Sequence, residues 1–263
     1  MSTSLRVVSY NILYGGQDRL EKIAAVLRAL EADIVGLQEA NEPAHVARLA
    51  EQLGMAHFVA RSRNSPFHVA LMSRFPIENP ENLCNRCPHL WRSALRATVP
   101  AGGAPLRVIV LHLAPGMRAD REAVRQGELD ELWPVLHAPE EAGRPALMMG
   151  DFNSTAPWHP HVSDGLRPAY SGARIPREVI QRIRDAGWTD AVHRARPDDG
   201  THSVSVASPT TRVDFIWLSP ALSDRLLDAR VEALEIAREA SDHYPVRAIL
   251  RPVAAAPNGT APR

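Results

Sequence analysis

Short apolar runs and longer segments with helical spacing alternate along most of this 263-residue chain. Apolar runs of about four to eight residues predict buried strands, and apolar positions that recur every three or four residues predict helices. Strands are predicted at residues 5–10, 33–38, 69–73, 95–99, 106–111, 146–149, 213–218 and 246–250. Helices are predicted at residues 20–30, 43–53, 120–137 and 177–186. Strands mixed with helices in this way are typical of an α/β protein.

The connections between these elements predict mixed sheets. A Pro-Ala-Gly-Gly segment at residues 100–103 joins two strands as a hairpin, whereas predicted helices separate other strands. Residues 78–92 are rich in Asn, Pro and Cys, residues 155–172 lack a clear period, and both are predicted as loops. The Ala- and Pro-rich residues 253–263 are predicted to be a disordered tail. Because motifs that must meet lie near both ends, residues 1–252 are predicted to form one domain.

Composition and charge narrow the classes of protein. A hydrophobic content of 45% fits an ordinary packed core, and a formal net charge of zero predicts no bulk attraction to nucleic acid. No apolar run approaches the roughly 20 residues of a membrane span, and the N-terminus lacks a basic segment followed by an apolar one. We therefore expect a soluble, cytoplasmic protein without a transmembrane segment, and we expect a monomer.

Polar clusters stand at the ends of five predicted strands. They are Ser9-Tyr10-Asn11, Gly36-Leu37-Gln38-Glu39, Gly150-Asp151-Phe152-Asn153, Arg212-Val213-Asp214-Phe215-Ile216 and Ser241-Asp242-His243-Tyr244-Pro245-Val246. Such side chains converge only if the strands share one end of a sheet. Convergent carboxylates in that setting call for a cation.

Three acidic or amide residues are the strongest candidates for chemistry. Glu39 ends an apolar strand, where a buried carboxylate is costly unless it has a partner. It is therefore the best candidate for a direct metal ligand. The alternative is that Glu39 caps the helix that follows. Asp151 and Asn153 are two positions apart and point the same way if the strand continues through them. They could then orient a water and hold a phosphate oxygen, although an Asx turn is the alternative.

The remaining candidates are two histidines, an asparagine and an arginine. His243 has an ordinary pKa of about 6.5, which suits proton exchange near neutrality, and it needs an orienting carboxylate. His112 ends a strand, where a lone histidine is more often structural. Asn11 could bond a phosphate or a water beside the metal, or simply end its strand. Arg212 could clamp a phosphate or brace a nearby carboxylate.

Taken in order, these blocks and Leu111-His112-Leu113 resemble the endonuclease/exonuclease/phosphatase superfamily, the deoxyribonuclease I-like metal-dependent phosphoesterases. The resemblance runs from Ser9 to Val246. It implies a four-layer sandwich of two packed mixed β-sheets flanked by helices, with the active site at one end. It also implies a cofactor, Mg²⁺ or Mn²⁺.

The resemblance assigns roles residue by residue. It places the metal on Glu39, and Asp242 would then complete a carboxylate pair with it. Asp151 would lie beside the attacking water and touch a metal, with Asn11 close by. Asp214 would orient His243, and His112 would protonate the leaving oxygen or stabilise the transition state. His68 stands near where the deoxyribonuclease I group has a glutamate partner for that histidine, so the partner of His112 stays open.

The expected function is metal-dependent hydrolysis of a phosphoester by a phosphodiesterase or phosphatase, with an endonuclease or exonuclease on DNA or RNA as the alternative. The substrate could be nucleic acid, a lipid headgroup or a soluble metabolite. Asn41 stands where abasic-site nucleases usually carry a lysine, so abasic-site repair is disfavoured. The few aromatic residues give little sign of a platform for stacking the bases of a single strand. An inactive phosphate- or partner-binding relative would lack site residues, yet all are present. Cys84 and Cys87 could form half of a zinc site or a redox pair, but ordinary loop cysteines are favoured.

Overall fold

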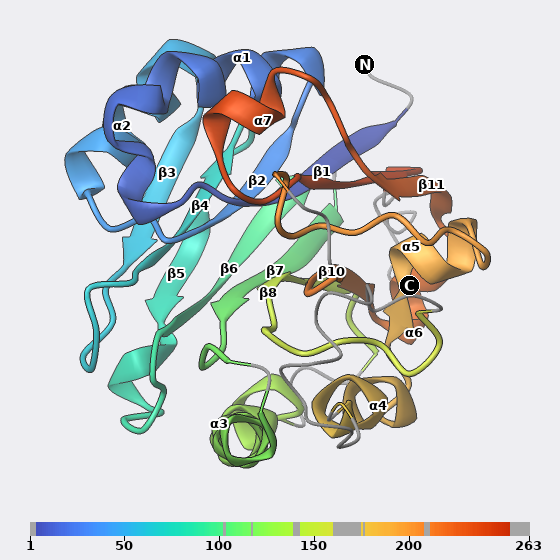
Figure 1. Cartoon of the computed structure of the whole chain (residues 1–263). Coiled ribbons are helices and arrows are strands. Elements are labelled where there is room, and N and C mark those ends of the chain that lie inside the picture. Colours follow the sequence, from blue (N-terminus) through green and yellow to red (C-terminus); the bar gives the residue numbers. More distant parts are fainter. Residues whose placement is uncertain are drawn as a thin grey trace, which may run out of the picture.

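The computed structural model of the chain describes residues 4–101, 104–116, 118–138, 143–159, 175, 177–207 and 211–252 (Figure 1). The strands are β1 (Leu5–Asn11), β2 (Ile34–Gln38), β3 (Ala56–Ala60), β4 (Val69–Ser73), β5 (Glu78–Asn82), β6 (Ser93–Ala101), β7 (Ala104–His112), β8 (Ala146–Asp151), β9 (Thr189–Asp190), β10 (Asp214–Leu218), β11 (Leu226–Val231) and β12 (Val246–Leu250). The α-helices are α1 (Leu20–Ala29), α2 (Pro43–Leu53), α3 (Ala119–Leu136), α4 (Glu178–Asp185), α5 (Ala191–Ala195), α6 (Pro220–Ser223) and α7 (Ala237–Ala240). Two 3₁₀ turns, η1 (Tyr14–Arg19) and η2 (Leu83–Asn85), complete the described elements.

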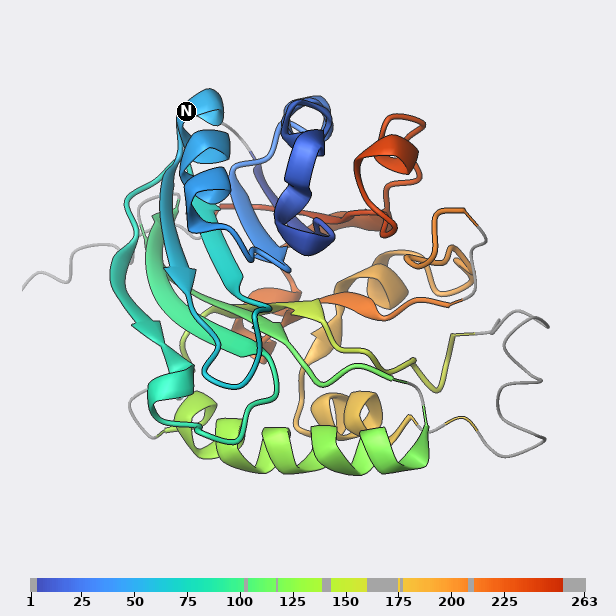
Figure 2. The same cartoon turned by 60° about the vertical axis from the view of Figure 1, so that its left-hand side comes forward.

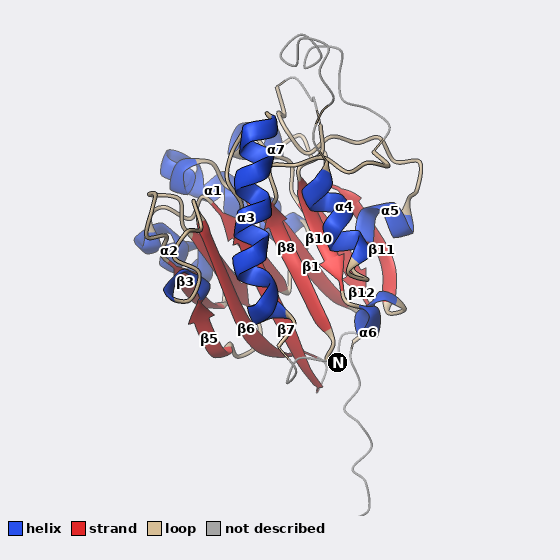
Figure 3. Cartoon of the chain, turned by 90° about the horizontal axis from the view of Figure 1, so that it is seen from below, coloured by secondary structure: helices blue, strands red, loops and turns tan. Residues whose placement is uncertain are grey.

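The strands form two six-stranded sheets, with the orders β11-β12-β1-β2-β4-β3 and β5-β6-β7-β8-β10-β9. Each sheet contains one parallel pair, β1 with β2 and β7 with β8, among antiparallel neighbours. Helices α1, α2 and α7 cover the first sheet, and α3 and α4 cover the second, as Figures 1 and 3 show. Figure 2 shows α3 running along the outer face of its sheet. The expected sandwich of two mixed sheets between helical layers is confirmed.

Apolar side chains on both faces of the central strands hold the layers together. All five residues of β2 are buried, because this strand faces helices on one side and the second sheet on the other. The sheets approach closely at Gly36, where an added Cβ would lie 2.9 Å from the side chain of Met149. A second apolar cluster, between the second sheet and its helices, includes Leu129, Phe152 and Trp217.

All the strands and helices predicted from apolar spacing are present, with ends that shift by at most two residues. The prediction of a loop was wrong for residues 78–85, which form β5 and η2, whereas residues 86–92 lie in no helix or strand. Strand β5 has no apolar alternation. It forms by main-chain pairing with the edge of β6, assisted by a 2.6 Å ion pair between Arg96 and Glu81.

Strand register brings several candidate residues to one end of the sandwich. His112 pairs with Asp151 across the parallel β7 and β8, and Asp151 pairs with Asp214 across the antiparallel β8 and β10. In the first sheet, Asn11 at the end of β1 pairs with Gln38, the residue before Glu39. The parallel pairs therefore deliver their carboxyl ends to one site.

Candidate active site

Asp151 lies at the centre of the site and is 2% exposed. Its position depends on Gly150, which has a φ of 157° and whose added Cβ would lie 1.9 Å from the carbonyl oxygen of Leu111. No residue with a side chain could therefore precede Asp151 in this conformation. The main-chain N–H of Asn153 donates to Asp151 Oδ1 over 2.9 Å, and Asn11 Nδ2 donates to Oδ2 over 3.1 Å.

Two imidazoles flank the Asp151 carboxylate. His112 Nε2 lies 3.2 Å from Oδ2 and His243 Nε2 lies 4.0 Å from the same oxygen. On its other side, His243 Nδ1 is 2.8 Å from Asp214 Oδ2, so the expected pairing of these two residues is present. Asp214 thereby fixes the orientation of the ring and directs Nε2 toward Asp151.

The charges in this cluster shift the pKa values in opposite directions. Burial alone would lower the pKa of His243, but Asp214 and Asp151 outweigh it and raise that pKa to about 10. Burial would raise the pKa of Asp151, yet His112, His243 and Arg92 together bring it well below its usual range. In the metal-free protein, His243 is therefore an imidazolium at neutral pH, and Asp151 is a carboxylate.

Arg92 contacts His112, whose partner could not be predicted from the sequence. Its Nη1 touches the imidazole of His112 and lies 3.4 Å from Glu39 Oε1, and its side chain is buried. Burial and the Arg92 charge lower the pKa of His112, so this imidazole is neutral near pH 7. His68 has another role, since its Nδ1 accepts the N–H of Ser62 over 3.1 Å.

Sequence reasoning missed Arg92, although one signal pointed to it. The predicted hairpin pairs the start of one strand with the end of the other, and Ser93 is indeed opposite His112. The residue just before that strand therefore arrives at the same end of the sheet as His112. Arg92 Nε is buried without a hydrogen-bond partner among the described residues, which leaves a donor beside the site.

Glu39 adopts a backbone conformation that side chains rarely take, with a φ of 56°. Asn153 shares this feature with a φ of 50°. Strained residues of this kind concentrate at functional sites. Glu39 Oε2 accepts the main-chain N–H of Tyr14 over 2.9 Å, and the residue is 7% exposed.

The described residues contain one close group of metal-binding atoms, from Asp151, Asp214 and His243, all within 4.8 Å of one another. Asp214 Oδ1 is buried and has no hydrogen-bond partner in the described part of the chain, so one carboxylate oxygen is available. Two carboxylates and an imidazole suit a hard or borderline divalent cation. Since ligation requires a neutral imidazole, a cation here would compete with the proton on His243.

Asp242 and Arg212 are not part of the close group formed by Asp151, Asp214 and His243. Asp242 lines a surface hollow of about 270 Å³ together with Leu13, Arg19 and Arg238, and its charge contributes to the raised pKa of His243. Its pairing with Glu39 on one metal stays a prediction. Arg212 donates to both carboxylate oxygens of Asp190, over 3.1 and 2.6 Å, and is 2% exposed. Of its two expected roles, these contacts describe the bracing of a carboxylate.

The sequence profile of the Endonuclease/Exonuclease/phosphatase family matches residues 8–243. The chain belongs to this family. No functionally curated protein matches the chain. Among solved structures, it resembles an AP endonuclease from Archaeoglobus fulgidus at 21% identity and a TM-score of 0.75, covering 94% of this chain and 99% of that one.

Two further solved structures share the fold. The 3′ phosphatase NExo from Neisseria, bound to a product DNA hairpin, has 22% identity and a TM-score of 0.74, with 93% and 98% of the chains covered. An endonuclease/exonuclease/phosphatase protein from Beutenbergia cavernae has 24% identity and a TM-score of 0.71, with 98% of this chain and 74% of that one covered. Family membership indicates a phosphoesterase or nuclease.

In this family member, helix α3 fixes the loops around the site through three buried charged residues, Glu122, Arg125 and Glu128. Arg125 Nη1 donates to the carbonyl oxygen of Ala114, two residues after His112. Glu122 pairs with Arg125 over 2.8 Å, and its Oε1 accepts the hydroxyl of Ser154, next to Asn153. Sequence reasoning missed this network, because charged residues on a long helix usually face water.

Glu128 links two segments by hydrogen bonds: the one that leads into Arg92 and the one that follows His112. Its two carboxylate oxygens accept the N–H groups of Trp91 and Ala114, over 2.8 and 2.9 Å. Burial raises its pKa to about 7, which those two donors and Arg125 partly oppose.

Replacing Glu122 with alanine should lower the free energy of unfolding by about 3–5 kcal/mol, since it would leave the buried guanidinium of Arg125 uncompensated. Urea denaturation would measure the change. Asp130→Ala is the matched control on the same helix, because Asp130 pairs with Arg182 at the surface and its side chain is 66% exposed. Removing that pair should cost less than about 1 kcal/mol. Equal losses in the two variants would contradict the role assigned to the buried network.

Cys84 and Cys87 are both 1% exposed and pack in the apolar cluster of the second sheet. Cys87 Sγ contacts the carbonyl oxygen of Glu131 at 3.4 Å. Burial raises the pKa of Cys87 to about 11, so its thiol stays protonated at neutral pH. The expectation of loop cysteines missed their burial, but these contacts give no support to a zinc or redox role.

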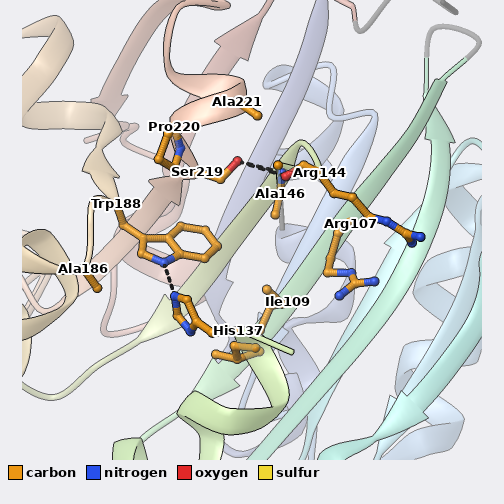
Figure 4. Close-up of a pocket in the computed structure, with 12 residues that line it drawn as sticks. Arg107, Ile109, His137, Arg144, Ala146, Ala186, Trp188, Ser219, Pro220 and Ala221 are labelled. Carbon is orange, nitrogen blue, oxygen red and sulfur yellow. Dashed lines mark hydrogen bonds between the residues drawn. The ribbon is translucent and has the colours of Figure 1, made fainter. Parts of the chain in front are cut away.

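Only part of the loop predicted over residues 155–172 lies among the described residues. Trp158 Nε1 donates to Asp190 over 3.1 Å, and His159 is buried. His161, Tyr170 and the tail at residues 253–263 lie outside the described residues. A pocket of about 280 Å³ between Trp188, His137 and Arg107 (Figure 4) sits at the Ala146 end of β8, and none of the candidate site residues lines it. Among the described residues, no helix is long and apolar enough to cross a bilayer.

Proposed function

We propose that this protein hydrolyses a phosphoester with the help of a divalent metal ion, Mg²⁺ or Mn²⁺. The observation that carries the proposal is the Asp151 carboxylate, which is buried, ionised and flanked by His112 and His243. A fixed carboxylate beside an imidazolium can accept a proton from water while a positive charge faces the phosphate. An inactive relative would have no need to keep these charges buried together.

Hydrolysis joins a water oxygen to phosphorus and breaks the ester P–O bond, while one proton leaves the water and one reaches the leaving oxygen. Asp151 is the proposed acceptor of the water proton, because Asn11 and Asn153 hold both of its oxygens in place. His243 is the proposed donor to a phosphoryl or leaving oxygen, since Asp214 holds its Nδ1 over 2.8 Å and directs its Nε2 toward Asp151. The neutral state of His112 argues against it as the acid, and its contacts favour a role in positioning Asp151 and Arg92.

Binding of the phosphate is assigned to donors that line the same end of the sheets. Arg92 has a free Nε among the described residues and a guanidinium suited to phosphate oxygens. Asn11 and Asn153 have amide groups at the site, and Asn153 Nδ2 is also held by the Leu113 carbonyl oxygen over 3.2 Å. The expected phosphate contact from Arg212 is replaced in this proposal by a positioning role through Asp190.

A bound divalent cation would neutralise charge on the phosphoryl oxygens. Glu39 is the proposed principal ligand, because its buried carboxylate has only one charged partner among the described residues, Arg92 at 3.4 Å. Asp151, with Asn11 beside it, is the second proposed ligand. Asp214 Oδ1 is a further buried oxygen without a described partner, in the close group that Asp214 forms with Asp151 and His243.

Hydrolysis of bis(p-nitrophenyl) phosphate should stop in excess EDTA and return when Mg²⁺ or Mn²⁺ is restored. Glu39→Gln should raise the metal concentration needed for half-maximal rate while leaving the fold intact, because it removes a ligand charge without changing volume. Glu42→Gln, at an exposed carboxylate three positions away, is the matched control and should keep the wild-type requirement. Full activity in excess chelator, from protein without bound metal, would overturn the metal-dependent mechanism.

A nuclease is the second candidate function. The structural neighbours named as an AP endonuclease and as a 3′ phosphatase bound to a DNA hairpin support it by fold alone. The neutral net charge of the chain runs against a broad electrostatic attraction to nucleic acid.

A further inference from the structure

The contact between Asp214 and His243 joins residues from different sheets. Asp214 begins β10 in the second sheet, and His243 precedes β12 in the first sheet. Their side chains approach to 2.8 Å, so the separation of the two main chains must be held closely at this end of the sandwich. Strand pairing fixes each residue only within its own sheet. A segment that bonds to both main chains would set their separation directly.

Residues 203–206 contact the main chain around His243. Val204 forms an isolated β-bridge with His243 itself. The carbonyl oxygen of Ser203 accepts the N–H of Tyr244, the next residue, over 2.7 Å. The segment is therefore held against the chain that leads from His243 into β12.

The side chain of Ser203 reaches the other residue of the pair. Ser203 is fully buried, and its Oγ accepts the N–H groups of Val213 and Asp214 over 3.1 and 3.2 Å. One residue thus bonds to the main chain of Asp214 through its hydroxyl and to the residue after His243 through its carbonyl oxygen. Because a buried N–H that loses its acceptor is costly, the main chain at Asp214 should shift when this hydroxyl is removed.

We infer that Ser203 is a positioning residue for the reaction, because its hydroxyl holds the main chain of Asp214 at the separation from His243 that their contact requires. This inference rests on the function proposed above and adds a residue to the same site. Ser203 acts through the Asp–His pair rather than on the substrate, so its removal should loosen the orientation of the imidazole. The sequence gives little sign of this role, since a serine outside the predicted strands is also typical of a turn.

Ser219 provides a matched control at the opposite end of β10. It is also buried, and its Oγ accepts the N–H of Ala146 over 2.9 Å. Ser203→Ala and Ser219→Ala should therefore both lower the urea midpoint of unfolding. Only Ser203→Ala should lower kcat for bis(p-nitrophenyl) phosphate, by about 10- to 100-fold, with a smaller change in KM. Ser203→Cys, whose sulfur is a weak acceptor, is a second variant and should lose kcat in the same range.

Two further measurements separate positioning from a general loss of stability. In a His243→Ala background, Ser203→Ala should lower kcat by no more than about twofold further, because the residue through which it acts is gone. Amide hydrogen exchange follows the bond itself and does not depend on activity. Exchange should accelerate at Val213 and Asp214 in Ser203→Ala, and at Ala146 instead in Ser219→Ala.

The outcomes distinguish this inference from the proposed function. A kcat within about twofold of the wild type in Ser203→Ala, an equal loss in Ser219→Ala, or a loss that multiplies with that of His243→Ala would overturn the positioning role alone. Failure of the wild type to hydrolyse any phosphoester with Mg²⁺ or Mn²⁺ would instead overturn the proposed function. Unchanged exchange at Val213 and Asp214 in Ser203→Ala would contradict the inference in either case.

Discussion

Replacing His243 with alanine is expected to lower kcat by about 10²- to 10⁴-fold. The imidazolium of His243 lies 4.0 Å from the Asp151 carboxylate and is buried, so water cannot take over its charge when the side chain is removed. Its interaction with the phosphate strengthens mainly in the transition state. Substrate affinity should therefore change much less than the rate. Steady-state kinetics with saturating Mg²⁺ would measure both quantities.

Asp214→Asn should cost most of the same activity, because Asp214 acts through His243. The 2.8 Å contact between Asp214 Oδ2 and His243 Nδ1 fixes the ring and raises its pKa. The double variant should then be little worse than His243→Ala, since neighbouring groups that act as a unit have non-additive effects. Losses that simply multiply in the double variant would show that the two residues work independently.

Apolar spacing predicted the main strands and helices because each central strand is buried on both faces. The five consecutive buried residues of β2 are one example. Strands β5 and β11 escaped prediction for the opposite reason. They lie at sheet edges, carry exposed polar residues and form by pairing with a neighbour that is itself ordered. Such strands depend on tertiary context rather than on their own pattern.

The centre of the site was predictable because strand ends bring polar residues together. His112, Asp151 and Asp214 follow from the register of neighbouring strands, once those strands are known to share a sheet. Arg92 was harder to predict, since it reaches the site from the residue before β6. The burial of the charged residues of α3 could not be predicted for another reason. Glu122 and Glu128 look like solvated helix residues until the loops that they hold are folded beneath them.

Closeness in sequence leaves the role of Arg212 open until the direction of its side chain is known. Asp242 adjoins His243 and contributes to its raised pKa, and it also lines a surface hollow with Arg19. Arg212 precedes Asp214 by two positions, but its guanidinium is held by Asp190 from β9. A short motif fixes which residues are close along the chain. The direction of each side chain depends on packing by distant elements.

Asp151→Asn is expected to reduce kcat by about 10³-fold or more, because it removes the proposed proton acceptor together with a buried charge. The substitution keeps the size of the side chain, so Asn11 and Asn153 should stay close to it. Asp120→Asn, which removes a carboxylate whose side chain is 64% exposed on α3, is the control and should retain the wild-type rate. A rate within a few-fold of wild type in Asp151→Asn would exclude Asp151 as the acceptor.

The same substitution should change the titration of His243 in the metal-free protein. Asp151 is one of the charges that raise the pKa of His243 to about 10 from an ordinary value of 6.5, so Asp151→Asn should move it downward, as followed by NMR. Because the folded-state pKa exceeds the unfolded one, the imidazolium stabilises the fold fully below pH 6.5, and that contribution disappears as the pH rises to about 10. The variant should therefore lose this contribution at a lower pH than the wild type. An unchanged His243 titration would mean that Asp151 does not contribute to the raised pKa of His243, although the two side chains lie 4.0 Å apart.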